Sequence, residues 1–178
     1  MSDPSAPIVV NIEDVEEITR SSGEHWGASY KPITPALSEL EGGRLGVNLT
    51  RLEKGRTVCP FHAHQRSDEV FYVLSGRGVL RYGVELIPIR AGDCISCPAG
   101  NGVAHQIANP HNDDLVYLAI GANDPDEVAV YPDSGKVLVR SLRRIGRLES
   151  MEYMDGEPER PRVFELIDER LGGEPPPQ

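Results

Sequence analysis

Hydrophobic and polar residues alternate over short distances through the middle of the chain. From about residue 43 to 122 the alternating runs are brief and are separated by glycines or an Asn-Pro pair; they read RLGVNLTRLE, EVFYVLSG, RGVLRYG, VELIPIR, DCISCP, VAHQIAN and DLVYLAIG. Many short strands between turn residues are typical of a β-sandwich or barrel, not of alternating strand and helix units. The pattern therefore predicts an all-β core.

The two ends of the chain lack this regular series of short alternating runs. Residues 1–42 include Pro32 and Pro35, which interrupt any long regular element, so we expect an N-terminal arm against a barrel at 43–125. Residues 126–178 are expected to form a C-terminal extension. In that extension EVAVYPDSGKVLVRSL is a candidate strand pair, MDGEPERPR is a linker, PRVFELIDERL is a short helix and GGEPPPQ is a disordered tail.

Composition limits the classes of partner. The 178 residues carry a formal charge of −10, which disfavours nucleic acid and anionic membrane surfaces because both require clustered Lys and Arg. An apolar fraction of 39% suffices for one sizeable core. The start, MSDPSAPIVV, lacks the basic segment of a secretory signal, and no run approaches a membrane span. With three cysteines, an odd number, we expect a cytoplasmic protein.

The stretch CPFHAHQRSDEVFYVLSGRG, residues 59–78, holds the first candidate chemistry. His62 and His64 are two residues apart, so on a strand both imidazoles point to the same side. The polar QRSD segment that follows is turn-like, and we expect the chain to reverse there. A hairpin would then bring Glu69 beside the two histidines, with Phe71 and Val73 on the same face.

A fourth candidate ligand lies in GDCISCPAGNGVAHQIAN, residues 92–109. His105 lies on a short apolar strand that the chain approaches through Pro98, Gly100 and Gly102. Three imidazoles and one carboxylate suit a divalent first-row transition metal, namely Fe, Mn, Zn or Ni. The histidines must be neutral to bind, so we expect metal loss as the pH falls.

These two segments resemble the two sequence motifs of the cupin superfamily. The pattern G-x6-H-x-H-x4-E-x6-G runs from Gly55 to Gly76, and the second motif runs from Gly92 to Asn109. Two spacings depart from the usual pattern. Gly55 precedes His62 by one extra residue, and four residues instead of two separate Gly100 from His105, which bears on how that histidine is presented.

The resemblance covers about residues 45–121 and implies a fold and a ligand set. Cupins are double-stranded β-helix, or jelly-roll, barrels that hold a metal inside, and the matching ligands here are His62, His64, Glu69 and His105. The segment YPDSGKVLV (131–139) is also similar to small bacterial cupins. Barrels of this family commonly pair through their arms, so the resemblance further implies a homodimer.

Other chemically notable residues have plainer interpretations. Cys94 and Cys97 are three apart, so on a strand they face opposite sides, which is poor geometry for a disulfide or chelation; we expect small buried residues. By parity Cys59 should face away from the histidines and lie in the core. Asn109 is expected to satisfy a turn.

The remaining candidates lack ligand spacing. His111 follows a strand-breaking Asn-Pro pair and is expected in a surface loop, while His25 in the arm is expected to pack against the barrel or a partner subunit. For four further polar residues of the core we expect exposed or sheet-surface positions: Arg51, Arg81, Tyr72 and Tyr82.

The family resemblance leaves the function open among three hypotheses. The first is an isomerase of sugar or sugar-phosphate type, in which the metal polarises a carbonyl and its neighbouring hydroxyl. The second is a non-heme Fe(II) dioxygenase, whose metal binds O₂ and substrate at open positions. The third is a non-catalytic cupin that binds a small molecule. The flanks hold no helical DNA-binding domain, which disfavours a transcription factor, and no catalytic acid or base is assigned.

Overall fold

The computed structural model describes residues 7–38 and 43–172, and strands dominate its regular structure. The chain divides into two compact units, Met1–Arg147 and Leu148–Gln178. All strands of the described residues lie in the first unit, which confirms the all-β prediction. None of the helices in these ranges combines the length and apolar character needed to cross a bilayer.

The elements follow the sequence pattern closely. A 3₁₀ turn covers Ile12–Asp14, and the helices are α1 (Pro35–Ser38) and α2 (Arg162–Leu171). The strands are β1 (Ile18–Ser22), β2 (Trp26–Pro32), β3 (Leu45–Leu52), β4 (Arg56–Thr57), β5 (Ala63–His64), β6 (Glu69–Ser75), β7 (Arg77–Tyr82), β8 (Glu85–Arg90), β9 (Cys94–Cys97), β10 (His105–Asn109), β11 (Leu115–Ala122), β12 (Val128–Tyr131), β13 (Lys136–Val139) and β14 (Arg144–Gly146).

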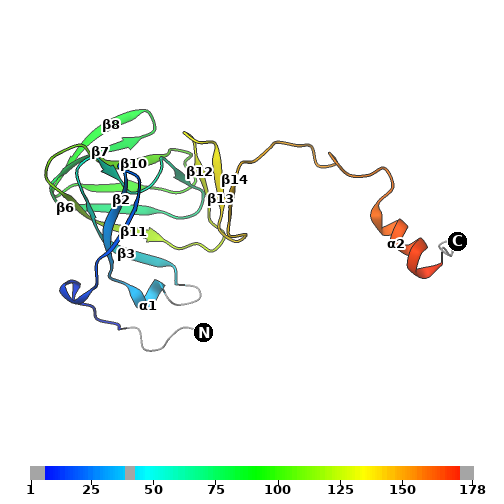
Figure 1. Cartoon of the computed structure of the whole chain (residues 1–178), viewed down its shortest axis with the longest axis horizontal. Helices are drawn as coiled ribbons and strands as arrows, with labels where there is room; N and C mark the ends of the chain where they lie inside the picture. Colours follow the sequence, from blue (N-terminus) through cyan, green and yellow to red (C-terminus); the bar gives the residue numbers. More distant parts are fainter. Residues whose placement is uncertain (1–6, 39–42, 173–178) are drawn as a thin grey trace. The chain divides into compact units, whose positions relative to one another are not determined.

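Two sheets form the first unit (Figure 1). The larger sheet has ten strands in the order β8-β7-β10-β4-β2-β3-β11-β6-β9, with β1 beside β2. The smaller sheet has the order β14-β13-β12-β5. An antiparallel bridge between His62 and His105 links the segment leading into β5 to β10 of the larger sheet. The two curled sheets have the arrangement expected of a double-stranded β-helix.

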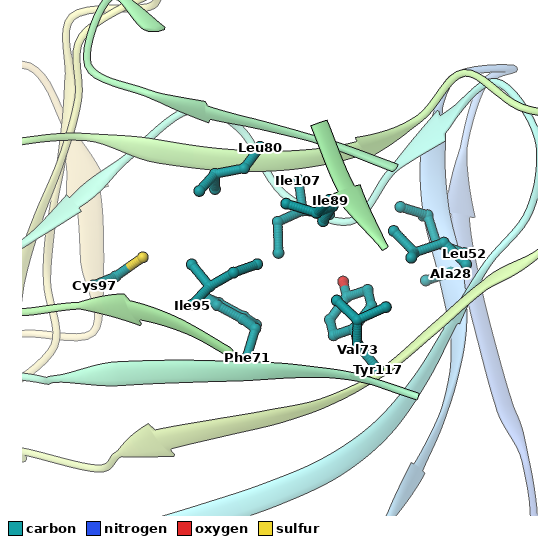
Figure 2. Close-up of a cluster of buried hydrophobic side chains, with 11 residues drawn as sticks. Ala28, Leu52, Phe71, Val73, Leu80, Ile89, Ile95, Cys97, Ile107 and Tyr117 are labelled. Carbon is teal, nitrogen blue, oxygen red and sulfur yellow. The ribbon is translucent and has the colours of Figure 1, made fainter. Parts of the chain in front are cut away.

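The main core lies between strands that face each other. Figure 2 shows Leu80, Ile89 and Ile107 pointing toward Phe71 and Ile95 from the opposite layer. Alternation explains the pattern, because in β6 the odd-numbered Phe71 and Val73 are buried while the even-numbered residues between and after them are exposed. Burial of these apolar side chains is the main stabilising contribution to the barrel.

Both ends of the chain contribute strands to the first unit. In the range expected to form an arm, β2 pairs with β3 and with β4. In the range expected to form an extension, β12 pairs with β13, as predicted, and also with β5. The predicted short helix is α2. Most of the expected disordered tail falls on residues 173–178, outside the described residues, and the domain boundaries at 42 and 125 stay predictions.

One predicted local structure is wrong. The segments around His64 and Glu69 were expected to form a hairpin, but β5 pairs with β12, whereas β6 pairs with β11 and β9. The polar residues 65–68 therefore carry the chain from the smaller sheet to the larger one. The expected face of β6 is nevertheless observed, since Glu69 and Phe71 line the same cavity.

Candidate metal centre

The structure brings together all four side chains predicted to bind a metal. His62 precedes β5, His64 ends it, Glu69 begins β6 and His105 begins β10. The His62–His105 bridge holds two of these segments side by side through paired backbone hydrogen bonds of 3.1 and 2.7 Å. Gly100, with φ of +71°, donates its backbone N–H to the carbonyl of His64, which ties the second motif to the first.

The ligand atoms converge on one point. The Nε2 atoms of His62 and His64 are 3.1 Å apart, and Glu69 Oε2 lies 2.8 Å from His105 Nε2. The same carboxylate oxygen lies 3.7 and 3.3 Å from Nε2 of His62 and His64. Donors that share one ion at about 2.1 Å stand about 3 Å apart, so these spacings fit a first-row divalent metal. Within the described residues, His62, Glu69 and His105 form a group that could hold a metal ion, and His64 Nε2 lies beside two of them.

The ring of His62 is oriented by the turn before it. Its Nδ1 lies 2.8 Å from the carbonyl oxygen of Pro60, so an Nδ1–H donated there leaves the Nε2 lone pair directed at the cluster. The Sγ of Cys59 also lies 3.7 Å from Nδ1 and lines the cavity. The prediction that Cys59 faces away was wrong, because the chain around Pro60 is not a strand and its residues do not alternate.

The ring of His64 meets a carboxylate that sequence reasoning missed. Glu127 is fully buried, and its Oε1 lies 3.4 Å from His64 Nδ1. Its two oxygens accept backbone N–H groups of Gln65 at 2.9 Å and Arg66 at 3.2 Å. The pairing of β12 with β5 places it there. His64 Nδ1 has no hydrogen-bond partner among the described residues, so Glu127 acts on the ring through its charge, which favours a proton on that nitrogen.

Electrostatics favour a positive charge at the cluster. Burial alone would lower the pKa of His62, but the neighbouring Cys59 sulfur and Glu69 carboxylate outweigh it and raise that pKa to about 10. Burial alone would raise the pKa of Glu69, but hydrogen bonds from the three histidines hold it far below its ordinary value. A site that attracts protons to nitrogen and keeps its carboxylate ionised is suited to a cation.

The cluster lies on the wall of a cavity of about 430 Å³, a size suited to a small molecule. The barrel contributes Tyr30, Asn48, Thr50 and Gln106, while the β12–β13 hairpin contributes Ala129, Tyr131, Leu138 and Arg140. The Tyr131 ring stacks on His62 with centroids 5.9 Å apart. The β12–β13 hairpin, which contains the segment YPDSGKVLV, thus forms one wall of the cavity.

The other candidate residues lie away from the cluster. Asn109 is buried and donates to the carbonyls of Leu52 and Asp113 at 2.8 Å, which confirms its structural role. On β9 Cys94 is exposed and Cys97 is buried, which confirms that the two side chains face opposite sides. The prediction that Cys94 is buried was wrong.

The two remaining histidines and four polar residues are not in the cavity wall. His111 lies in a loop, and exposed His25 has Nδ1 2.9 Å from the carbonyl oxygen of Gly55. Tyr72 is 41% exposed. Two arginines are committed to carboxylates on the outside of the barrel, Arg51 to Glu17 and Asp114, and Arg81 to Asp133. Tyr82 packs at the margin of the core.

Comparisons with known proteins agree with this geometry. Residues 48–121 match the family model described as Cupin domain. An oxalate-binding protein from Thermotoga maritima is 39% identical over 106 residues, covering 49% of this chain and 86% of the relative. The chain belongs to the cupin superfamily. The predicted resemblance, drawn from the two motifs, is confirmed.

Solved structures share the cupin fold. A sugar phosphate isomerase of the cupin superfamily from Silicibacter pomeroyi is 28% identical with a TM-score of 0.66, covering 79% of this cupin and 92% of that chain. A predicted oxalate decarboxylase from Thermotoga maritima is 25% identical with a TM-score of 0.56, covering 65% of this chain and 98% of that one.

Proposed function

We propose that this cupin holds one divalent first-row transition metal with His62, His64, Glu69 and His105 and binds a small oxygen-rich metabolite beside it. The observation that supports this proposal is the convergence of three Nε2 atoms and one carboxylate oxygen on a cavity wall. Fe, Mn, Zn and Ni all accept such a donor set. The metal, when bound, would polarise a carbonyl or hydroxyl oxygen of the ligand.

An isomerase of sugar or sugar-phosphate type is the reaction we propose for the cavity. The likeness to the sugar phosphate isomerase from Silicibacter pomeroyi supports it. An isomerisation needs a group that moves a proton between neighbouring carbons. Among the described residues that line the cavity, Glu69 is the carboxylate, and Tyr30, Tyr117 and Tyr131 carry hydroxyl groups. We propose Glu69 Oε1 or one of these tyrosine hydroxyl groups as the group that would move that proton.

Binding without turnover is the second candidate function. Among the described residues of the cavity wall, Glu69 is the carboxylate, and it contacts all three histidines. This favours binding without turnover, because no carboxylate of the wall is then left as a dedicated acid or base for proton transfer. The relative described as an oxalate-binding protein also supports it. Oxalate and a hydroxy-carbonyl pair share two adjacent oxygens, so one cavity suits both kinds of ligand.

The test begins with anaerobic reconstitution using Fe(II), Mn(II), Zn(II) or Ni(II), followed by NMR assays of sugars and sugar phosphates. Isomer formation that depends on the metal supports the enzyme. A rise in melting temperature with oxalate, without turnover of any sugar, supports the binding protein. O₂ uptake that requires a candidate substrate, and that occurs with Fe(II) but with none of the other metals, would contradict both and indicate a dioxygenase.

The cupin resemblance also leads us to propose a homodimer, and the three free cysteines fit a reducing cytoplasm. Light scattering on the full chain at several concentrations tests the dimer. A mass of about one chain, near the 19.5 kDa of the sequence, would contradict it.

A further inference from the structure

Arg140 brings a guanidinium group to the cavity from the strand pair that follows the barrel motifs. On β13 Leu138 lies opposite Ala129 of β12, and both side chains line the cavity. Arg140 directly follows the last residue of β13, and its side chain also lines the cavity. Its backbone N–H donates to the carbonyl of Glu127 at 2.9 Å, which ties the residue to the segment that precedes β12.

The charge of Arg140 is not neutralised by a carboxylate in the described part of the chain. Its Nη1 donates to the backbone carbonyl oxygen of Asp124 at 2.9 Å, and no carboxylate oxygen lies within ion-pair distance of it there. Arg51 and Arg81, in contrast, each meet an acidic side chain. In a chain with a formal charge of −10, an arginine left without an acidic partner beside a cavity is available to bind an anion.

The charges around the cavity point the same way. A divalent ion and Arg140 together carry three positive charges, against two negative charges from Glu69 and buried Glu127, which leaves one positive charge. Glu127 is already satisfied by backbone N–H groups and is not positioned to pair with the guanidinium. A neutral ligand would leave this positive charge unmatched in a half-enclosed cavity.

We infer that the ligand of this cupin is a small organic anion, whose carboxylate or phosphate group binds Arg140 while its other oxygens face the histidine cluster. The inference rests on the proposed function, because it places the second end of the ligand at the metal-binding residues. Arg140 is thus a specificity-determining residue, and the chain segment after the barrel motifs selects the ligand. The cavity of about 430 Å³ has room for both ends of such a molecule.

Binding calorimetry on the full, metal-loaded chain tests the inference with three probes: oxalate, ribose 5-phosphate and uncharged ribose. We expect one anionic probe to bind and ribose to bind at least about tenfold more weakly. Arg140→Gln should weaken binding of that anion about 10- to 100-fold, and Arg140→Lys should restore part of it because the charge returns without the fork of donors. Arg77→Gln, which removes an exposed arginine on β7, is the matched control and should bind like the wild type.

Metal content and melting temperature of every variant separate the possible failures. If Arg140→Gln keeps its metal and its fold but binds the anion as the wild type does, the inference is wrong while the metal site stands. Ribose binding as tightly as the better-bound anion, or no binding of either anion, also overturns it. A wild-type chain that takes up no metal contradicts the proposed function itself. Oxalate as the bound probe indicates a carboxylate ligand, and ribose 5-phosphate indicates a phosphate.

Discussion

The histidines of the site are oriented by one partner that is near in the sequence and by one that is far away. His62 is oriented by Pro60, two residues before it, but His64 is faced by Glu127 from another strand. Glu127 lies at the centre of this support, since it also accepts the N–H groups of Gln65 and Arg66. Hydrogen bonds from Ser67 and Gln65 outweigh burial and keep the pKa of Glu127 below its ordinary value, so the carboxylate is charged.

The role of Glu127 as a positioning residue leads to a prediction. Glu127→Gln keeps the volume but removes the charge behind His64, so we expect metal affinity to fall about 10- to 100-fold. Competition with a chromophoric chelator measures that affinity. Glu85→Gln, on exposed β8, is the matched control and should leave it unchanged. Wild-type affinity in a folded Glu127→Gln variant would mean that Glu127 serves stability alone.

The two cysteines of β9 should differ in reactivity. Burial, with a smaller effect from Glu69, raises the pKa of the Cys97 thiol to about 12, whereas Cys94 is exposed. The thiolate is the reactive form, so at about pH 8 iodoacetamide should label Cys94 and leave Cys97 unmodified until the protein is unfolded. Mass spectrometry of the digested peptides measures this. Comparable labelling of both in the folded protein would show that Cys97 is not enclosed.

Local patterns predicted the four clustered residues, and non-local contacts explain what they missed. His62, His64, Glu69 and His105 stand in motifs whose spacing is visible along the chain. Glu127 was missed because only the pairing of β12 with β5 brings it to His64. Cys59 was misplaced because strand parity fails where Pro60 breaks the alternation.

At the scale of elements, short strands and their turns were predictable, but strand partners were not. The alternating runs correspond to β3 and to the strands from β6 to β11. The turn-like segment before β6 suggested a hairpin, yet that segment crosses between sheets, because a turn composition does not determine which strand comes next in space. The β12–β13 hairpin was predicted as a strand pair, while its position on the cavity wall was not.

The turn between β6 and β7 depends on glycine for two reasons. Gly76 has φ of +79°, and a Cβ there would lie 2.1 Å from the carbonyl oxygen of Asp114. Gly135 has a similar φ of +63° but nothing within 4 Å. We expect Gly135→Ala to lower the free energy of unfolding by about 1 kcal/mol and Gly76→Ala by about 3 kcal/mol or more. Urea denaturation measures both, and equal losses would contradict the close approach at Gly76.

At the scale of the whole molecule, the chain from Ala28 to Arg140 supplies every described residue of the cavity wall. This range lies within the first compact unit, Met1–Arg147, and includes strands on both sides of the matched cupin region at 48–121. The family motifs therefore account for the cluster of three histidines and Glu69, and the segment that follows them accounts for Glu127 and Arg140.

This division predicts the outcome of two truncations. A chain ending at residue 147 should keep the metal content and the melting temperature of the full chain, because it retains every strand of the first unit. A chain ending at residue 125 lacks β12 and Glu127, and should lose most of its metal. Elemental analysis with thermal denaturation measures both. Loss of metal from the chain that ends at residue 147 would show that residues beyond 147 support the site.

The most direct test is the metal stoichiometry of the reconstituted chain by inductively coupled plasma mass spectrometry. We predict about one divalent ion per chain in the wild type and less than about a tenth of that in His62→Ala, His64→Ala and His105→Ala. His111→Ala, whose histidine lies in a loop outside the cavity wall, should bind as much as the wild type. A wild type without metal, or full metal content in the three folded variants, would contradict the account.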